Sequence, residues 1–348
     1  MKILVTGGAG FIGSALVREA IIRKFEVLNV DALTYSSSLE SLESVANNCL
    51  YSFSNTNIKN IDSLYELFQQ FAPDAVIHLA AETHVDKSID KPLDFIETNI
   101  LGTFNMLQAS YKYWLDKNKP KEFRFLHVST DEVYGSLGKE GYFTESTKYD
   151  PSSPYSASKA SSDHLVRAWG ITYDLPILIT NCSNNYGPFQ FPEKLIPVVI
   201  NNALSGKLIP VYGSGENVRD WLYVEDHVDA LLTVLENGQM GSTYNIGGNS
   251  EKSNIEIVTQ ICQILNFLRP TSTSSKYEDQ ISFTADRPGH DYRYAIDASR
   301  IQKELNWAPN HSFEEGLHKT ILWYLENEEW WRSLLRKTKL DLRQGTLQ

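Results

Sequence analysis

The first half of the chain alternates short apolar runs with longer amphipathic segments. The apolar runs are rich in β-branched and aromatic residues, which predicts buried strands at KILVT (2–6), FEVLNV (25–30), DAVIHLA (74–80), FRFLHVS (123–129) and PILITN (176–181). The segments between them have helical periodicity, at about 11–24, 62–71, 92–116 and 154–173. Pro92 and Pro154 fit the first turn of the last two helices. This alternation indicates a parallel sheet with helices on both faces.

The pattern changes after about residue 182. Loops such as NNYGPFQFPEK and VYGSGENVRDW are rich in Gly, Pro, Asn, Arg and aromatic residues, a composition that favours a ligand-contacting lobe. We therefore predict an α/β fold in which 1–181 form a Rossmann-type doubly wound parallel sheet that carries the catalytic residues. A smaller mixed α/β substrate-binding domain is expected over 182–330, with some chain crossing between the two. Residues 331–348 are expected to form a charged, solvated tail.

Composition and charge exclude several function classes. The 348 residues are 42% hydrophobic and carry a formal net charge of −11, which argues against non-specific binding to nucleic acid or to acidic membranes. The three cysteines are far apart and form no CxxC spacing, so we predict neither a metal site nor a disulfide framework. No apolar stretch approaches the ~20 residues of a membrane span, and the start of the chain does not resemble a signal peptide. We expect a cytoplasmic protein.

The stretch TGGAGFIG (6–13) is the first candidate site. Its glycines at positions 7, 10 and 13 follow a predicted strand and open a predicted helix. Glycine suits a backbone that turns tightly beside a pyrophosphate, and a helix N-terminus offers N–H groups to phosphate. Asp31 ends the second predicted strand, near the ~20-residue spacing expected for a ribose-binding acid. A carboxylate accepts a 2′-hydroxyl but repels a 2′-phosphate, so the pattern favours NAD over NADP. The alternative is a helix-opening turn without a ligand.

Tyr155 and Lys159, within YSASK, form the second candidate site. They are four residues apart on a predicted helix and therefore share one face. A lysine cation beside a phenol stabilises the phenolate and lowers the pKa of the tyrosine, which makes it usable as a base. Taken alone, the pair also fits an exposed helix face, and the upstream glycine loop favours the catalytic interpretation.

Two adjacent acids, Asp131 and Glu132, follow a predicted buried strand in the stretch STDEVYG (129–135). A buried strand rarely ends in neighbouring carboxylates, because an unpaired buried charge is costly. They are either solvated loop acids or a positioned acid/base pair. Neighbouring residues of a regular strand face opposite sides. If both acids serve one site, a bend or turn is therefore required at this point.

Several longer stretches carry a family resemblance: LAAETHVDKSI (79–89), STDEVYG, PSSPYSASKASSDHLVRAW (151–169), NCSNNYGPFQFPEKLIP (181–197), VRDWLYVEDH (218–227) and DRPGHD (286–291). With the glycine loop, they make the chain similar to the extended short-chain dehydrogenases/reductases acting on nucleotide sugars, and within these to the dTDP-glucose 4,6-dehydratases. The resemblance extends across nearly the whole chain. It implies a tightly bound NAD that is regenerated each turnover, dTDP-glucose as substrate, a homodimer and a place in deoxysugar biosynthesis, rhamnose being one example.

The resemblance also implies a reaction, in which water leaves across C5 and C6 of the glucosyl ring and a ketone remains at C4. Tyr155, supported by Lys159, takes the O4 proton while C4 gives a hydride to NAD, and Thr130 orients the O4 hydroxyl. Glu132 then removes the C5 proton, and Asp131 protonates the departing O6. The hydride finally returns to C6. The two carboxyl groups must hold opposite protonation states at one pH.

The binding residues that the resemblance implies fall into two sets. The expected NAD contacts are Gly7, Gly10, Phe11, Ile12, Gly13, Asp31, Ala32, Leu33, Thr34, Asn57, Ile58, Leu79, Ala80, Ala81, Glu82, Thr83, Thr98, Tyr155, Lys159 and Asn185. The expected nucleotide-sugar contacts are Thr83, Thr130, Asn184, Lys194, Leu195, Pro210, Val211, Tyr212, Arg219, Asn254, Asp286, Arg287, Pro288, Gly289 and His290. Arg219 is the natural diphosphate partner, because guanidinium matches phosphate geometry.

The chain departs from the family pattern at three places. Ala32 stands where lysine is usual, Asn57 where an acid precedes Ile58, and Tyr292 where arginine commonly follows DRPGHD. These positions bear on adenine-side affinity and substrate preference. Two alternatives stay open: another sugar-nucleotide dehydratase or 4-epimerase, which would generally lack the order Thr-Asp-Glu, and a NAD-binding regulatory protein without catalysis.

Overall fold

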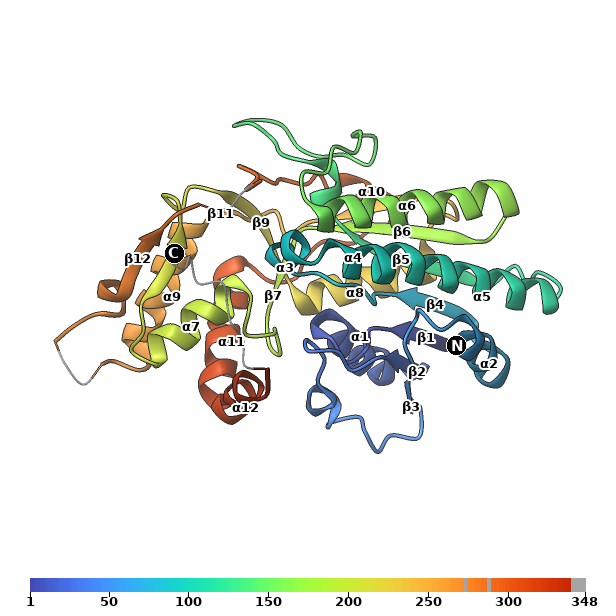
Figure 1. The fold of residues 1–348 in the computed structure, drawn as a ribbon, viewed down its shortest axis with the longest axis horizontal. Coiled ribbons are helices and arrows are strands. Elements are labelled where there is room, and N and C mark those ends of the chain that lie inside the picture. Colours follow the sequence, from blue (N-terminus) through green and yellow to red (C-terminus); the bar gives the residue numbers. More distant parts are fainter. Residues whose placement is uncertain (272–273, 287–288, 339–348) are drawn as a thin grey trace.

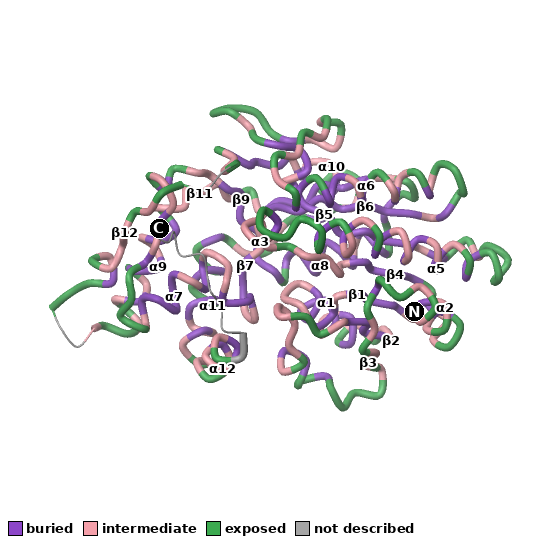
Figure 2. Tube along the Cα trace, viewed as in Figure 1, coloured by how far each residue is buried: buried purple, intermediate pink, exposed green. Residues whose placement is uncertain are grey.

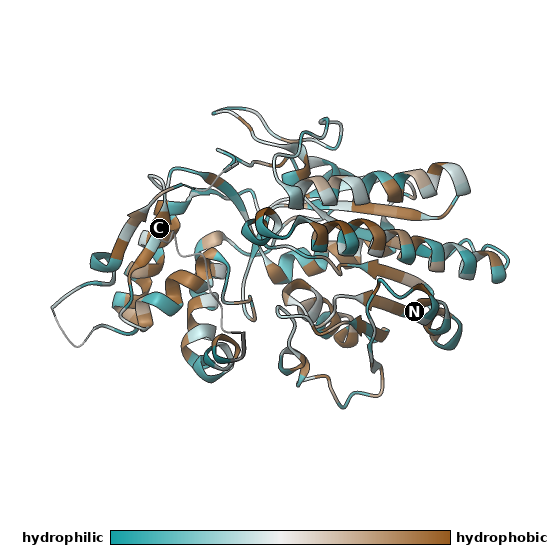
Figure 3. Cartoon of the chain, viewed as in Figure 1, coloured by the Kyte–Doolittle hydropathy of each residue, from teal (hydrophilic) through white to brown (hydrophobic). Residues whose placement is uncertain are grey.

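The computed structural model describes residues 1–271, 274–286 and 289–338 (Figure 1). Within them, a sheet of seven parallel strands runs in the order β10-β6-β5-β4-β1-β2-β3. The strands are β1 (Lys2–Thr6), β2 (Glu26–Asp31), β3 (Tyr51–Asn55), β4 (Ala75–His78), β5 (Arg124–Thr130), β6 (Ile177–Cys182) and β10 (Thr243–Ile246). The five predicted strands are confirmed as β1, β2, β4, β5 and β6. Their apolar runs are the buried centre of the molecule (Figures 2 and 3).

Helices cover both faces of this sheet, as predicted. The core on one face includes residues of α1 (Phe11–Ile22), α8 (Val224–Asn237) and α10 (Ser299–Leu305). The core on the other includes α2 (Ile61–Phe71), α5 (Gly102–Asp116) and α6 (Pro154–Tyr173). The predicted helix at 92–116 consists of α4 (Pro92–Phe95), a π-helical stretch (Ile96–Leu101) and α5, and the short α3 (Val85–Asp90) precedes it.

A second, smaller group of elements has its own apolar core. One sheet has the order β11-β9-β7, and β12 pairs in parallel with β8. The strands are β7 (Asn184–Tyr186), β8 (Ile209–Tyr212), β9 (Val218–Tyr223), β11 (Glu251–Ser253) and β12 (Ile281–Thr284). The helices are α7 (Leu195–Leu204), α9 (Asn254–Leu268), α11 (Phe313–Glu326) and α12 (Glu328–Thr338). Short 3₁₀ turns lie at Leu39–Leu42, Asp131–Tyr134 and Tyr277–Gln280.

The chain returns to the first sheet after residue 182, because α8, β10 and α10 all pack there. The domain division at that residue stays a prediction. The expected solvated tail is wrong for its first part, since α12 continues to Thr338 and buries Trp331 and Leu334. Residues 339–348 lie outside the described residues. No helix within the described ranges has the length and apolar character to span a membrane.

Candidate active site

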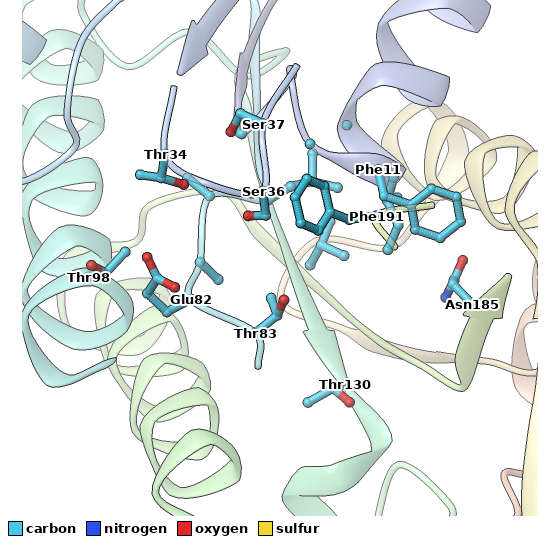
Figure 4. A pocket seen from close by; sticks show the side chains of 18 of the residues that line it. Phe11, Thr34, Ser36, Ser37, Glu82, Thr83, Thr98, Thr130, Asn185 and Phe191 are labelled. Carbon is cyan, nitrogen blue, oxygen red and sulfur yellow. The ribbon is translucent and has the colours of Figure 1, made fainter. Parts of the chain in front are cut away.

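A cavity of about 440 Å³ lies at the carboxyl ends of the central parallel strands. Gly7, Asp31, Leu79 and Thr130, which end or follow four neighbouring strands, all line it. Figure 4 shows side chains from separate segments around this space, among them Thr83 and Thr130. Ligands of open α/β sheets bind at this edge, where the strand order reverses.

The glycine loop forms one wall of the cavity, and two of its glycines leave no room for a side chain. Gly7 has φ +73°, and a Cβ there would lie 2.8 Å from the backbone nitrogen of Ala80. A Cβ on Gly13 would lie 2.0 Å from the carbonyl oxygen of Gly7. No side chain caps the N-terminus of α1. The loop therefore brings bare backbone to the cavity.

Asp31 fixes the loops on both sides of the cavity wall. Its Oδ2 accepts a hydrogen bond from the N–H of Ala9 at 2.9 Å. Its Oδ1 accepts from the N–H of Leu33 at 2.8 Å and from the hydroxyl of Ser37 at 2.9 Å. Asp31 is buried and also lines the cavity. The same carboxylate can thus shape the site and meet a ligand.

The predicted cofactor residues gather on this cavity with one exception. All of those named above line it except Leu33, whose side chain points partly to solvent and whose φ is +51°. Leu33 contributes through its N–H to Asp31 instead. Sequence patterns do not distinguish a residue that lines the cavity from one that only supports a lining residue.

The acid pair sits on the turn that the sequence requires. β5 ends at Thr130, and Asp131–Tyr134 form a 3₁₀ turn, so the predicted bend is confirmed. The Thr130 hydroxyl accepts a hydrogen bond from the N–H of Glu132 and donates one to Oδ1 of Asp131, each at 3.3 Å. Both acids line the cavity. The turn therefore presents two successive residues to one space.

The surroundings of Asp131 favour its protonated form. Its side chain is buried, and its Oδ2 has no hydrogen-bond partner within the described residues. Burial raises the pKa of Asp131 well above its usual value, and the negative charges of Glu132 and Asp220 raise it further. A protonated carboxyl group facing a cavity is suited to act as a general acid.

Tyr155 and Lys159 face the cavity from the first turns of α6. Ser153 caps this helix in a reciprocal capping box, and Pro154 occupies its first turn. Both Tyr155 and Lys159 are buried and line the cavity. The ammonium of Lys159 donates to the carbonyl oxygen of Val128 at 2.9 Å. The helix start thus places both side chains at the end of β5.

The predicted lowering of the Tyr155 pKa is wrong for the protein alone. Burial, followed by the charge of Glu132, raises the pKa of Tyr155 well above its usual value, although a hydrogen bond with Thr130 opposes this. Sequence spacing shows the lysine four residues away but not the carboxylate beside the phenol. In the protein alone, Tyr155 is therefore a neutral phenol.

The predicted substrate residues separate into two groups. Thr83, Thr130, Asn184, Lys194 and Leu195 line the cavity, and Lys194 Nζ donates to the carbonyl oxygen of Thr83 at 3.0 Å. Apart from Arg219, the other described members lie outside the lining, around β8 and the start of α9: Pro210, Val211, Tyr212, Asn254, Asp286, Gly289 and His290. Arg287 and Pro288 lie outside the described residues.

Arg219 lies outside the cavity lining but close to the acid pair. Its guanidinium donates to the carbonyl oxygens of Val218 at 2.7 Å and Asp291 at 2.9 Å, and it stacks on the ring of Tyr294 at 4.1 Å. It also lowers the pKa of Asp131. The arginine therefore connects the acid pair with the segment around residue 291.

The sequence reasoning missed several lining residues, among them Ser36, Ser37, Gln190, Phe191 and Glu193, of which Figure 4 labels Ser36, Ser37 and Phe191. The last three lie in FQFPEK, a stretch already singled out by its composition. The Glu193 side chain is buried and accepts a hydrogen bond from the hydroxyl of Tyr35 at 3.3 Å and from Lys87 Nζ at 3.4 Å. The sequence alone does not show that Glu193 is buried, because Tyr35 and Lys87 are far from it in sequence and only the fold brings them together.

Known proteins share this fold. A sequence model of the GDP-mannose 4,6 dehydratase family matches residues 4–320. A dTDP-glucose 4,6-dehydratase of Neisseria meningitidis serogroup B is 56% identical over 351 residues, covering 99% of each chain. The crystal structure of dTDP-glucose 4,6-dehydratase from Bacillus anthracis in complex with NAD has a TM-score of 0.85 at 45% identity, covering 96% of this chain and 99% of that one.

A second solved structure, the dTDP-glucose 4,6-dehydratase from Streptomyces venezuelae with NAD and dTDP bound, has a TM-score of 0.89 at 41% identity, covering 96% of this chain and 100% of that one. These matches span nearly the full length of each chain. The range that the family model matches, residues 4–320, contains the glycine loop, the acid pair and the tyrosine–lysine pair of this chain. The chain belongs to the dTDP-glucose 4,6-dehydratase family.

Proposed function

We propose that this protein is a NAD-dependent hydro-lyase that converts dTDP-glucose to dTDP-4-keto-6-deoxyglucose and water. The observation that carries the proposal is the acid pair on the 3₁₀ turn after β5, where Asp131 is buried in the cavity that Tyr155 and Lys159 also line and where burial raises its pKa. A hydride transfer alone needs the tyrosine and lysine. Loss of water needs an acid and a base in addition.

The cavity fits a dinucleotide at the glycine loop. The loop offers backbone without side chains, and Asp31 can accept a ribose hydroxyl. Two further buried oxygens of the lining, Asn184 Oδ1 and Gln190 Oε1, have no hydrogen-bond partner within the described residues and could meet polar ligand groups. Bound NAD would supply the hydride acceptor for C4, the hydride donor for C6 and a positively charged ring.

The first chemical step belongs to Tyr155, which removes the O4 proton as C4 is oxidised. Lys159 provides the positive charge that favours the phenolate, and Thr130 orients the O4 hydroxyl. Because burial and Glu132 raise the pKa of Tyr155 in the protein alone, positive charge is needed before it can act as a base. The ammonium of Lys159 and the positively charged ring of bound NAD would supply that charge.

The second step belongs to the acid pair. Once C4 is a ketone, the C5 proton is acidic enough for Glu132 to remove. Asp131, whose raised pKa favours the protonated form, gives its proton to the departing O6. Glu132 then returns a proton to C5 as C6 receives the hydride. The opposite tasks of two adjacent carboxyl groups follow from their different surroundings.

The nucleotide is expected to extend from the cavity toward β8 and α9. Arg219 lies between the acid pair and this region, which suits a diphosphate partner. Pro210, Val211 and Tyr212 on β8, with His290, would then contact the nucleoside. These residues lie outside the cavity itself, so the proposed nucleotide extends beyond it.

Incubation of the purified protein with dTDP-glucose tests the proposal. A 4-keto-6-deoxy product is expected from dTDP-glucose, with much lower yield from UDP-, GDP- and CDP-glucose in parallel. A C4 epimer as product would identify the alternative 4-epimerase. NAD binding without any turnover would identify the non-catalytic alternative.

Gly13→Ala is expected to abolish cofactor retention. The added Cβ would lie 2.0 Å from the Gly7 carbonyl oxygen, so the loop must move, at a cost of roughly 1–3 kcal/mol for such overpacking. The measurement is NAD content after gel filtration, together with thermal unfolding. Gly138→Ala is the matched control, since a Cβ there meets nothing within 4 Å. Retention of NAD by Gly13→Ala at the level of that control would contradict the cradle assignment.

We also infer a homodimer that forms through α5 and α6. Exposed apolar side chains on this face include Ile96 (47%) and Leu101 (52%) on the π-helical stretch before α5, Leu115 (38%) on α5 and Ile171 (83%) on α6. Exposed apolar surface of this kind is typical of an interface.

The unpaired state of Cys49, Cys182 and Cys262 supports the expected reducing, cytoplasmic location.

Leu101→Glu is expected to convert the dimer to a monomer, because a charge would be buried without a partner. Light scattering after gel filtration gives the mass of the assembly. Phe267→Glu is the matched control, since Phe267 is 84% exposed on α9. A Leu101→Glu protein with the wild-type mass would remove this face from consideration.

A further inference from the structure

The ammonium of Lys159 is deeply buried, with 5% of the residue exposed. A buried ammonium needs hydrogen-bond acceptors and a counter-charge, since desolvation strongly disfavours the charged form. Its nearest protein acceptor is the Val128 carbonyl oxygen at 2.9 Å, which is polar but neutral. The catalytic role of Lys159 depends on its charge, so the source of the compensating charge matters.

Asp163 supplies that charge from the next turn of the same helix. It is 0% exposed, and its Oδ1 lies 3.2 Å from Nε2 of His127. The same Nε2 lies 3.4 Å from the Lys159 ammonium. His127 thus stands between the cation and the carboxylate. Burial, followed by the charge of Lys159, lowers the pKa of His127 to about 4, so the imidazole is neutral at neutral pH.

The carboxylate is itself held in place. Its Oδ2 accepts hydrogen bonds from the Tyr149 hydroxyl at 2.8 Å and from Nδ2 of Asn181 at 3.2 Å. Asn181 Nδ2 also donates to the Thr130 carbonyl oxygen at 3.1 Å, at the residue before the acid pair. A neutral amide in place of Asp163 could still accept hydrogen bonds on one oxygen. It could not balance a buried ammonium.

Resting on the proposed function, we propose that Asp163, whose negative charge acts on Lys159 across the neutral His127, is a positioning residue that keeps the Lys159 side chain charged for the hydride-transfer step. Asp163 and His127 are absent from the cavity lining and touch neither substrate nor cofactor in this role. Their effect reaches the reaction only through Lys159.

The direction of the pH effect follows from the groups that surround Lys159. Burial lowers the pKa of Lys159, and the charge of Asp163 raises it. The other titratable groups near the ammonium are His78 on β4, His127 on β5 and Cys182 on β6. Removing the charge of Asp163 therefore lowers the pKa of Lys159 further. The ammonium is then lost at a lower pH, and activity falls earlier as the pH rises.

The test compares wild type, Asp163→Asn, Asp163→Glu and Asp226→Asn across pH by two measurements. One is the rate of dehydration of dTDP-glucose. The other is trace acetylation of Lys159, quantified by mass spectrometry against the exposed Lys303 in the same digest. Asp226 is the matched control, because it is a buried carboxylate that accepts two hydrogen bonds from His311 in another part of the molecule.

Asp163→Asn is expected to move the basic limb of the rate profile and the labelling midpoint of Lys159 to lower pH by about one unit or more. Asp163→Glu, which keeps the charge, and Asp226→Asn are expected to keep the wild-type midpoints. An unchanged midpoint in Asp163→Asn, or an equal shift in Asp226→Asn or Asp163→Glu, would overturn the proposal. If wild type does not dehydrate dTDP-glucose, the proposed function fails, and the labelling titration still decides the role of Asp163.

Discussion

Asp131→Asn is expected to stop the loss of water while leaving oxidation at C4 in place. Asparagine keeps the shape of a protonated aspartic acid but cannot give a proton to O6. General-acid catalysis is typically worth about 10²–10⁴-fold, so product formation should fall by that factor. In a single turnover with dTDP-glucose, reduced nicotinamide should accumulate, because the hydride has left C4 and has no deoxygenated C6 to return to. Absorbance of the reduced cofactor and product analysis together check this.

The same variant is expected to be more stable than wild type at neutral pH. The pKa of Asp131 is raised in the folded protein, so between the unfolded and folded pKa values the folded state binds the extra proton. Stability then falls as pH rises through this window. Asparagine removes that dependence. Thermal unfolding of Asp131→Asn should therefore occur at a higher temperature than wild type at pH 7, with the two converging at low pH.

Asp226→Asn is the control for both effects. It removes a buried carboxylate that accepts hydrogen bonds from the N–H and Nδ1 of His311, and it should lose stability while keeping activity. Wild-type dehydration by Asp131→Asn would refute its role as the acid. A lower unfolding temperature at pH 7 would refute the raised pKa of Asp131 in the folded protein.

Tyr155→Phe is expected to block the reaction one step earlier. Without the phenol, no group is placed to take the O4 proton, so the hydride stays on C4. The expected loss is again about 10²–10⁴-fold in rate, but no reduced nicotinamide should appear in a single turnover. Because Tyr155 is buried and packs edge-on against Phe95, phenylalanine should fit the same space. NAD content after gel filtration should match wild type.

The two variants are informative as a pair. Asp131→Asn should show a reduced cofactor without product, whereas Tyr155→Phe should show neither. Accumulation of reduced cofactor in Tyr155→Phe would mean that another group removes the O4 proton. The cavity offers Glu132 as that group, since its charge already acts on the phenol.

The sheet was predictable because its central strands are buried on both faces. Runs such as those of β1 and β4 must be apolar along their whole length, which leaves a clear signal. β3 (YSFSN) was missed because it lies at the sheet edge and is only partly buried, so polar residues interrupt it. β10 was missed because it joins the sheet from far along the chain, and local pattern carries no information on that pairing.

The site was predictable where a motif binds through its own backbone or a fixed spacing. The glycine loop and the acid pair are of this kind, and Asp131 and Glu132 lie on the turn that their shared role requires. The electrostatics were not predictable. The spacing of Tyr155 and Lys159 gives one helical face, but the pKa of Tyr155 is set by burial and by Glu132, which only the fold brings near.

The second group of predicted substrate residues shows a different limit. Tyr212 and His290 are far apart in sequence, yet their rings lie 6.3 Å apart beside β8, outside the cavity. Resemblance assigns such residues to one ligand without saying how they are arranged. A ligand reaching both the cavity and β8 must be elongated, which a nucleotide sugar is.

Incubation of the protein with dTDP-glucose in deuterium oxide tests the central claim most directly. The acid pair predicts a 4-keto-6-deoxy product that carries one solvent deuterium at C5, because Glu132 removes the C5 proton and returns one from a site that exchanges with solvent. The hydrogen that arrives at C6 should come from C4 of the substrate and not from the solvent. A product without deuterium at C5, or a C4 epimer that keeps its C6 hydroxyl, would contradict the account.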